Sequence, residues 1–320
     1  MEAFMTILEK YAYAVYSFGS FSSAAKELFI SQPALSSSIK RLEGELGFKL
    51  FDRSINPIAA TAEGKIYFEH LVAAEESKRA MLSRIRSMKG EYGGTVSVGA
   101  YAYSAYPLLA GVCGEFAKEH PEVTVKLDMG SIGALTNLVE KLKRRELDLM
   151  LNYTFDPKEH SADAVLDERL IIAMKSSVAG AREIAHLAID KKRIIERDYA
   201  RDATAVDPSV FKDIKFLPYS VFSDTKKRMD LILGEYKTAS CEVVGARQVS
   251  MHNRLMQNGV GAILTSDFHV RSGAFYSDDI LYFVPRSEHA KRTLYMITQK
   301  NAEPSSAAKM LMQKILSFEL

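Results

Sequence analysis

Residues 20–64 hold two short helical patterns separated by only a few residues, and this spacing limits the possible folds more than any other feature of the chain. Ser20 is placed to cap a first helix, in which Ala24 and Ala25 lie on one face. Ser31 is placed to cap a second helix that follows at once. Two helices joined by so short a turn must cross closely, and the small alanine side chains leave room for this contact. The pattern predicts a helix-turn-helix.

The second helix has one apolar face and one polar face. Residues at helical spacing form its buried stripe: Leu35, Ile39, Leu42 and Leu46. The opposite face carries short polar groups and a cation: Gln32, Ser36, Ser37 and Lys40. Pro33 is tolerated because the N–H groups of a first helical turn have no partner within the helix. Together with the basic hairpin that follows, this face is typical of a winged helix-turn-helix that enters the major groove of DNA.

The phrase GSFSSAAKELFISQPALSSSIKRLEGELGFKLFDR, closed by residues 61–64 (TAEG), resembles the DNA-binding domain of LysR-type transcriptional regulators. The resemblance rests on several spaced elements, so chance is a poor explanation for it. It implies a sequence-specific regulator of transcription that binds double-stranded DNA. Ser37 departs from the family pattern, in which a larger basic or polar residue often follows Ser36.

The predicted DNA contacts fall into three groups. Base edges are expected to face Gln32, Pro33 and Ser36. Phosphates are expected to face Lys40 and Arg41, and the wing is expected to reach the backbone or minor groove through Arg53. The whole predicted DNA-binding set is Ser31, Gln32, Pro33, Ser36, Ser37, Lys40, Arg41 and Arg53.

A chain of 320 residues is long enough for two or three domains. No apolar run approaches the ~20 residues that cross a bilayer, and the first residues are acidic where a signal peptide would be basic. We therefore expect a cytoplasmic protein that does not bind membranes. A net charge of +2 means that DNA affinity must come from the local placement of Lys and Arg. Cys113 and Cys241 have no metal-like spacing, and we expect no disulfide, metal or cofactor.

From Ala62 to about Lys89 the sequence predicts one long helix, capped by Thr61 and ended by a glycine-rich break. Its stripe follows heptad spacing: Tyr67, Leu71, Ala74, Lys78, Met81, Ile85 and Met88. The N-terminal chain is too short to cover this stripe, so we expect the helix to join two copies of the protein. Two recognition helices would then lie ~34 Å apart, one DNA turn. The alternative is an amphipathic helix packed on its own domain.

Beyond Gly94, short β patterns alternate with helical ones, which predicts parallel sheet built from βαβ units. The expected strands are 95–99, 123–128, 147–153, 169–174, 215–222, 241–245, 261–265, 280–284 and 293–298. The expected helices are 104–118, 131–145, 224–236, 251–258 and 305–316. Residues 179–209 give no clear pattern.

A more diffuse family resemblance continues through the phrases EFAKEHPEVTVKL, ELDLML and LMQNGVGAIL. It implies a periplasmic-binding-protein-like, α/β effector-binding domain made of two subdomains. The predicted domains are a winged helix-turn-helix at 1–61, a linker helix at 62–90 and an effector-binding domain at 91–320. Within the last, subdomain I covers 91–165 and 267–320, and subdomain II covers 166–266.

In open parallel sheets, ligands bind outside the carboxyl ends of strands, where helix N-termini carry partial positive charge. Four serines stand between an expected strand and an expected helix: Ser104, Ser131, Ser223 and Ser250. For each alone, a plain helix cap is the simpler interpretation. Their convergence on one cleft would favour a small carboxylate or another anion. Residues near strand ends complete the predicted effector site: Tyr101, Asn152 and Phe222. Tyr101 and the neighbouring Tyr153 could equally be ordinary packing.

Catalysis is not expected, and no catalytic residue is predicted. The seven histidines show no metal-binding pair and no nucleophile elbow, so we expect each to lie at the surface or to cap a helix. Some members of the resembled family switch through a cysteine pair in subdomain II. Cys113 falls in subdomain I, so that pair is missing here.

The sequence thus predicts a transcriptional regulator that responds to a small, anionic effector. Expected partners are double-stranded DNA, the effector and a second copy bound through the linker helix, with dimers pairing into a tetramer. RNA polymerase is a further candidate partner. Two alternatives stay open: an architectural or constitutive DNA-binding protein with a non-sensing C-terminal domain, and a solute-binding role for the C-terminal region, against which the attached DNA-binding domain argues.

Overall fold

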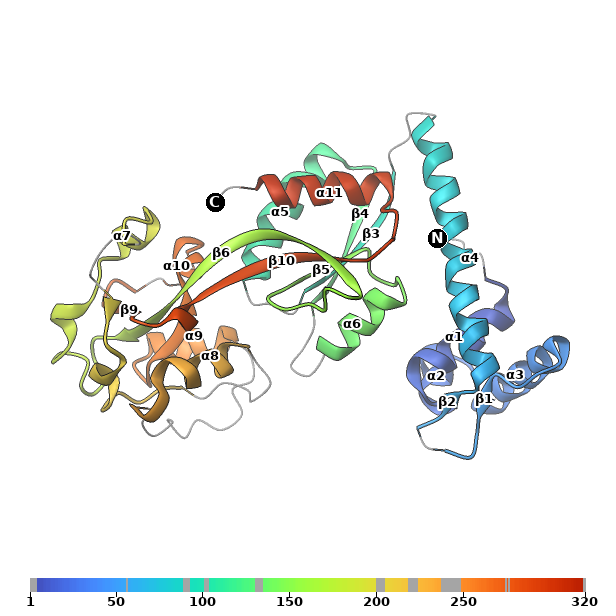
Figure 1. Ribbon diagram of the computed structural model, residues 1–320, viewed down its shortest axis with the longest axis horizontal. Helices are drawn as coiled ribbons and strands as arrows, with labels where there is room; N and C mark the ends of the chain where they lie inside the picture. The colour runs from blue at the N-terminus through green and yellow to red at the C-terminus, as the bar shows by residue number, and fades with distance from the viewer. Residues whose placement is uncertain are drawn as a thin grey trace. The chain divides into compact units, whose positions relative to one another are not determined.

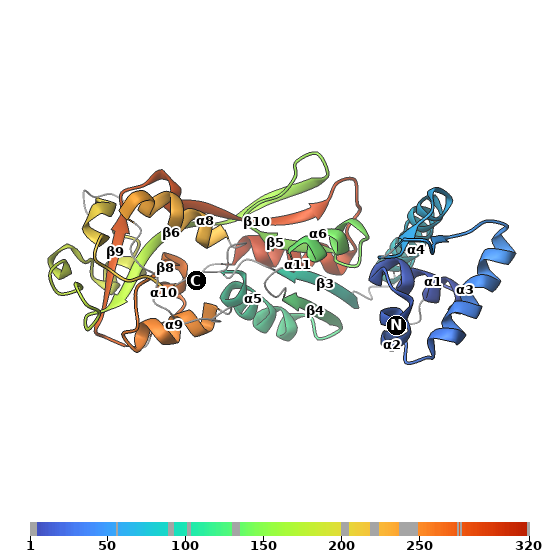
Figure 2. The ribbon, with the colours of Figure 1, turned by 90° about the horizontal axis from the view of Figure 1, so that it is seen from below.

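The computed structural model describes residues 5–55, 57–88, 93–100, 104–129, 135–199, 205–217, 224–236, 249–273, 275 and 277–318. The chain divides into two compact units, Met1–Glu91 and Tyr92–Leu320 (Figures 1 and 2). None of the helices in the described part of the chain combines the length and the apolar character that a bilayer-spanning segment needs.

The first unit is a winged helix-turn-helix followed by a long helix. Its elements are α1 Ile7–Phe18, α2 Phe21–Glu27, α3 Gln32–Leu46, β1 Phe51–Asp52, β2 Ala59–Ala60 and α4 Ala62–Met88. Both predicted caps of the helix-turn-helix are confirmed, because Ser20 Oγ accepts a hydrogen bond from Ser23 N and Ser31 Oγ accepts one from Ala34 N, each at 3.3 Å. Helix α1 precedes the predicted pair and begins in a capping box.

The three short helices and the start of α4 share one hydrophobic core. Ala24 is fully buried, as the close approach of the helices requires. Phe68 of α4 stacks on Tyr16 of α1, with ring centroids 4.3 Å apart. Gly64, in the first turn of α4, lies so close to β1 that a Cβ atom would stand 2.2 Å from the backbone oxygen of Leu50. The base of α4 is therefore built into the winged helix-turn-helix.

The second unit is built on an eight-stranded sheet. Its strands are β3 Gly94–Ala100, β4 Val123–Met129, β5 Leu149–Asn152, β6 His160–Lys175, β7 Ala205–Val206, β8 Ile263–Ser266, β9 Ile280–Pro285 and β10 Lys291–Gln299. Neighbouring strands follow the order β4-β3-β5-β10-β6-β9-β7, and β8 pairs with β6. Its α-helices are α5 Ala105–Glu119, α6 Leu135–Lys143, α7 Lys191–Ile195, α8 Asp224–Leu233, α9 Val249–Gln257, α10 Asp267–Arg271 and α11 Ser306–Ser317.

Two long strands, β6 and β10, run through both halves of this unit. Figure 1 shows them passing from the half that contains α5, α6 and α11 to the half that contains α7, α8, α9 and α10. Each half has its own core. In the first, Leu109 and Phe116 of α5 are buried with Leu311 of α11. In the second, Phe283 of β9 is buried with Met256 of α9. The predicted fold class, a winged helix-turn-helix with a long helix and a two-part α/β domain, is confirmed.

The sheet is mixed, whereas the alternation of strand and helix patterns predicted a parallel sheet. Strand β3 pairs in parallel with β4 and β5, and β7 pairs in parallel with β9. Strand β10 is antiparallel to β5 and β6, and β6 is antiparallel to β8 and β9. The reason is that β6 carries the chain from one half to the other and β10 carries it back, so the two meet in opposite directions.

Several local expectations also need correction. In place of a strand from 215, the described residues 215–217 hold an isolated parallel bridge between Phe216 and Ala262. Helix α9 begins at Val249, so Ser250 lies in its first turn rather than before it. The remainder of the expected strand 215–222, and all of 241–245, lie outside the described residues.

The segment 179–209, for which the sequence shows no clear pattern, contains regular structure, and three histidines are buried. Residues 179–209 contain the short helix α7, the strand β7 and two 3₁₀ turns, η1 Ala185–Leu187 and η2 Pro208–Phe211. His160 and His252 are buried, so the expectation of surface or capping positions was wrong for both. His269 is buried as well, and its Nδ1 lies 3.0 Å from Ser266 Oγ.

Candidate nucleic-acid interface and buried polar network

The N-terminal half of α3 presents a polar face to solvent because its opposite face is fixed in the core. Leu35 and Ile39 are completely buried and orient the helix. The predicted contact residues on the other side are exposed, apart from a half-buried Ser36: Gln32, Pro33, Ser37, Lys40 and Arg41. Ser31 has its hydroxyl committed to the helix cap. Its contribution is therefore to set where α3 begins.

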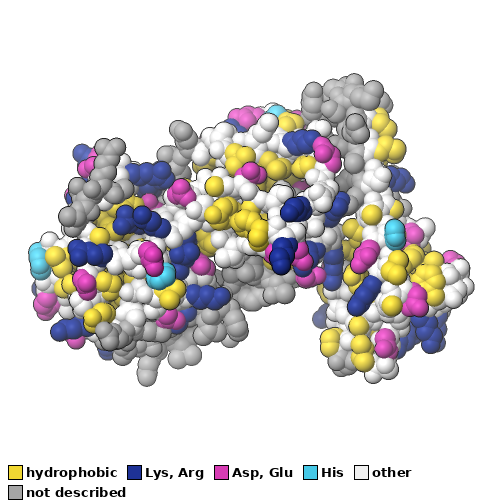
Figure 3. Space-filling model, in the orientation of Figure 1, with side chains coloured by type: hydrophobic (Ala, Val, Ile, Leu, Met, Phe, Trp, Pro, Cys, Tyr) yellow, Lys and Arg dark blue, Asp and Glu magenta, His cyan; other side chains and the backbone are white. Residues whose placement is uncertain are grey.

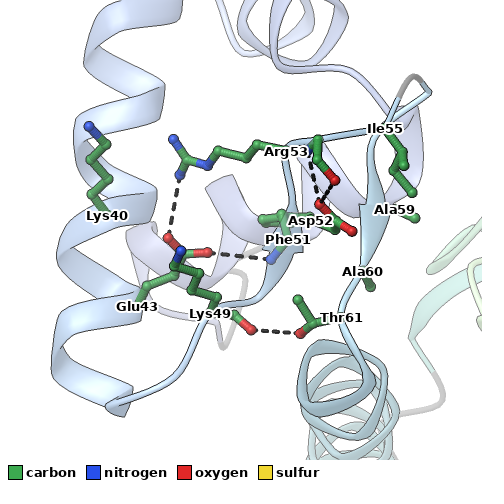
Figure 4. A pocket seen from close by; sticks show the side chains of 11 residues that line it. Lys40, Glu43, Lys49, Phe51, Asp52, Arg53, Ile55, Ala59, Ala60 and Thr61 are labelled. Carbon is green, nitrogen blue, oxygen red and sulfur yellow. Dashed lines mark hydrogen bonds and ion pairs between the residues drawn. The ribbon is translucent and has the colours of Figure 1, made fainter.

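The wing is tied to α3 by Arg53. Its guanidinium donates to Ser36 Oγ at 3.3 Å and to Glu43 Oε2 at 3.4 Å, and it lies over the Phe21 ring at 5.0 Å. Glu43 also accepts from the backbone N–H of Leu50 at 2.9 Å. Figure 4 shows this carboxylate between α3 and the wing. Glu43 was not identified from the sequence. The only signal for this role was a carboxylate on the side of α3 that faces the following hairpin.

An open hollow of about 690 Å³ lies between the second half of α3 and the wing (Figure 4). Its lining residues mix cations with two carboxylates: Lys40, Glu43, Lys49, Phe51, Asp52, Arg53, Ser54, Ile55, Ala59, Ala60 and Thr61. Over the visible face of both units, Lys and Arg are interspersed with Asp and Glu (Figure 3). The hollow thus gathers Lys40, Lys49 and Arg53 in a chain whose net charge is only +2.

The heptad stripe of α4 divides into two parts. Tyr67 and Leu71 pack against the core of the first unit. Farther along the helix, Met81 is 48% exposed and Ile85 is 41% exposed. Hydrophobic side chains are visible along α4 in Figure 3. The alternative of packing on its own domain thus holds for the first turns of α4, while the second part of the stripe is left open.

The predicted effector residues are only partly described. Four of them lie outside the described residues: Tyr101, Ser131, Phe222 and Ser223. Asn152 is buried at the end of β5, and its amide donates to Thr154 O at 3.0 Å. Ser104 stands directly before α5, as expected, but its side chain makes no cap hydrogen bond. The described members of this set do not by themselves outline a cleft, and the effector site stays a prediction.

Ser104 belongs instead to a buried polar network between the two halves of the second unit. Its hydroxyl accepts from Tyr153 OH at 3.0 Å. Tyr153 in turn lies under the guanidinium of Arg292, 3.8 Å from ring centroid to Cζ. Arg292 Nε donates to Glu168 Oε2 at 2.8 Å, and its Nη1 donates to Asp224 Oδ2 at 3.1 Å. Strands β6 and β10 thus bring residues from β5, α8 and the start of α5 to one charged group.

Burial and the neighbouring charges together set the protonation of this network. Burial disfavours the charge of Arg292, but Tyr153, Glu168 and Asp224 outweigh that effect and raise the pKa of its guanidinium. Burial also raises the pKa of Tyr153, whose phenol stays neutral and lies within hydrogen-bond distance of both Ser104 Oγ and Glu168 Oε2. Sequence reasoning missed Glu168 and Arg292. The only signal in the sequence was a pair of opposite charges next to two expected strands. Glu168 lies within the observed strand β6, and Arg292 lies within β10.

The described histidines, cysteines and carboxylates form no cluster with the number of ligands that a metal site needs. Cys113 is half-buried, and burial raises the pKa of its thiol, which disfavours the reactive thiolate. Cys241 lies outside the described residues.

Comparison with known proteins gives two matching family models. Residues 10–65 match the bacterial regulatory helix-turn-helix protein, lysR family, and residues 89–318 match the LysR substrate binding domain. A curated relative is the nitrogen assimilation regulatory protein nac of Escherichia coli, 31% identical over 205 residues that cover 62% of this chain and 65% of the relative. In the first relatives that it matches, the chain spans between 36% and 65% of their length.

Solved structures give the same architecture over nearly the whole chain. Full-length OxyR from Pseudomonas aeruginosa, in a cysteine-to-aspartate form, superposes with a TM-score of 0.60 at 19% identity and covers 98% of this chain and 99% of that one. Full-length CbnR in complex with its target DNA superposes with a TM-score of 0.51 at 19% identity and covers 98% of each chain. At these identities the likeness concerns the fold.

Proposed function

The chain belongs to the LysR family, whose two domain models together match most of its length, and we propose that it is a sequence-specific DNA-binding regulator of transcription that responds to a small-molecule effector. The observation that carries this proposal is the exposed polar face of α3, whose position is fixed by two fully buried residues on its other side. The solved complex of CbnR with its target DNA supports the same use of this fold. We also propose a cytoplasmic location, since the protein would act on DNA.

Gln32 is the residue that we expect to read a base. It is exposed in the first turn of α3, and a glutamine amide can pair bidentately with adenine. Gln32→Ala should weaken binding to a specific site by ~1–3 kcal/mol and relax the preference at one position of each half-site. The measurement is a titration of both proteins against the specific site and its single-base variants.

The matched control is Lys40→Gln, farther along the same face of α3. A lysine that contacts phosphate carries no sequence information, so its loss should weaken binding to all sequences equally and reduce the salt slope by about 1. If Gln32→Ala instead weakens every sequence by the same factor, Gln32 positions the protein and does not read a base.

We propose that α4 joins two copies of the protein through the exposed part of its stripe. Met81 and Ile85 lie on one face of the helix, one turn apart, and are left in solvent by their own unit. Pairing with a second α4 would remove this apolar surface from water. Pairing of dimers into a tetramer and contact with RNA polymerase would build on this interface.

The double substitution Met81→Glu with Ile85→Glu should therefore dissociate the dimer, because it places carboxylates where they would be desolvated and would face their own copies. Sedimentation measures the dimer affinity, and DNA titration measures half-site cooperativity. Ile66→Glu is the matched control, since Ile66 is an exposed residue of α4 that lies off the stripe. Equal dimer affinity in wild type and double variant would move the interface elsewhere.

We propose that the effector is a small anion. Helix N-termini that face the space between the two halves of the second unit would supply the partial positive charge. Ser131→Glu should abolish the response to the effector by placing a fixed negative charge at that point, while Ser131→Ala should weaken it. A screen of small organic acids by thermal shift and DNA footprinting tests this, and stabilisation by cations alone would contradict it.

A further inference from the structure

A second polar cluster lies in the α7–α10 half of the second unit and shares no residue with the predicted effector set. Its centre is Asp267, at the start of α10, which is 5% exposed. Asp267 Oδ1 accepts from the backbone N–H groups of Arg169 at 3.0 Å and Phe268 at 2.9 Å. Its Oδ2 accepts from the hydroxyl of Tyr199, which is 3% exposed. Both oxygens of the Asp267 carboxylate thus already accept hydrogen bonds, from two backbone N–H groups and one phenol.

Three arginines surround this hydrogen-bonded pair. Arg271 follows Asp267 by four residues in α10, on the same helix face. Arg197 precedes Tyr199 by two residues, directly after α7, which packs against α10. The backbone N–H of Arg169 donates the hydrogen bond to Asp267 that was described above. The three arginines are thus attached to the chain beside one buried contact, and they interact electrostatically with Tyr199 or with one another.

None of the three side chains makes a hydrogen bond or an ion pair with the described residues. Two of their nitrogen atoms, Arg169 Nε and Arg271 Nη1, are buried and have no acceptor there. Buried charged groups are normally paired, because an unpaired charge away from water is strongly unfavourable. Burial and the neighbouring charge of Arg197 lower the pKa of Arg271, as expected for like charges held together.

The charges of the cluster indicate which kind of ligand would complete it. Burial and the adjacent Asp267 carboxylate raise the pKa of Tyr199, so the phenol stays neutral. Among the described residues of this cluster, three guanidinium groups stand against the Asp267 carboxylate, which is an excess of two positive charges. Planar guanidinium forks match the oxygens of phosphate and carboxylate groups. Arg197 is exposed, so the cluster is open to solvent on that side.

We propose that Arg169, Arg197 and Arg271 form a binding site for a doubly charged small anion, carried by either a phosphate or a dicarboxylate. The anion would accept from the unpaired guanidinium N–H groups and would bridge β6, the segment after α7 and α10. This goes beyond the proposed function, since it adds a second ligand site to the same domain. An anion held here would fasten α10, whose preceding residue Ser266 contacts Ser104 of the other half at 3.4 Å.

The test is the thermal stability of the full chain, without DNA, in increasing inorganic phosphate or succinate at constant ionic strength. A ligand that binds only the folded state raises the midpoint temperature in a saturable way. We expect saturation with one or both anions, and which of the two acts identifies the phosphate or the dicarboxylate class. Arg271→Gln should weaken the response at least tenfold, and without the anion it should unfold at the same or a higher temperature, because a like-charge contact is removed.

Arg193→Gln is the matched control. Arg193 lies on α7 beside the cluster, but its Nε lies 3.8 Å from Asp198, so it is paired. This variant should keep the wild-type response. Arg197→Gln is a second test variant. Arg197 is exposed, so its replacement should not disturb folding, but the rise of the midpoint temperature with the anion should also be lost. Equal responses in all variants, or no saturable binding, would overturn the proposal. DNA affinity, measured on the same variants, tests the proposed function separately.

Discussion

Arg292→Met is expected to lower the free energy of unfolding of the second unit by about 3–5 kcal/mol, because removing one partner of a buried ion pair leaves the other charges without compensation. The side chain of Arg292 is 3% exposed, and that of Glu168 is 0% exposed. Without the guanidinium, Glu168 Oε2 keeps only the Tyr153 hydroxyl at 3.3 Å, and its Oε1 already has no partner among the described residues. Urea unfolding followed by circular dichroism measures the change.

The control for this result is Arg286→Met. Arg286 is exposed, and its guanidinium makes a hydrogen bond to the backbone oxygen of Ala205 at 3.0 Å. Losing an exposed contact of this kind should change stability by at most about 1 kcal/mol. A double replacement of Arg292 and Glu168 by apolar residues should recover part of the loss, since no charge is then left buried. Equal losses for Arg292→Met and Arg286→Met would mean that the network contributes little to folding.

Gly64→Ala is expected to destabilise the first unit by about 3 kcal/mol or more, the reverse of the usual effect of alanine in a helix. Alanine normally stabilises a helix interior relative to glycine by roughly 1 kcal/mol. At Gly64, however, the new Cβ atom would lie 2.2 Å from the backbone oxygen of Leu50, and backbone cannot move aside as a flexible side chain can. The first turn of α4 would have to separate from β1.

Gly44→Ala is the matched control, because Gly44 lies inside helix α3 of the same unit and a Cβ atom there meets nothing within 4 Å. It should stabilise the protein by roughly 1 kcal/mol. Denaturant unfolding of both full-length variants measures the two effects, and DNA titration should follow them, with loss of affinity for Gly64→Ala. Two changes of the same sign would show that β1 and α4 tolerate a wider spacing.

The helix-turn-helix could be predicted from sequence because its determinants are local. Ser20 and Ser31 cap helices through N–H groups three residues away, and the stripe of α3 is visible as a helical period. The long helix α4 was predictable for the same reason. What its sequence did not reveal is that Tyr67 and Leu71 pack on the first unit, since a heptad stripe is the same pattern whichever partner covers it.

The second unit was less predictable because its decisive contacts join distant segments. Arg292 and Glu168 are 124 residues apart, and no periodicity relates them. Strand direction is likewise a property of the path between strands, so β6 and β10 could not be seen to run antiparallel. Ser104 illustrates the limit at a single residue. Its place before α5 was predicted, but its hydroxyl bonds to Tyr153 and Ser266 rather than to the helix.

The pairing of β6 with β10 shifts register between Leu294 and Tyr295, two residues beyond Arg292. An extra residue in one strand bends a ladder and increases its twist while the bonds on either side persist. Strands β6 and β10 thus join the two halves of the second unit through a hydrogen-bonded ribbon whose bend and twist are greatest at this register shift. We therefore expect the two halves to turn relative to each other about this point, and such a rotation would change the distances within the nearby Arg292 network.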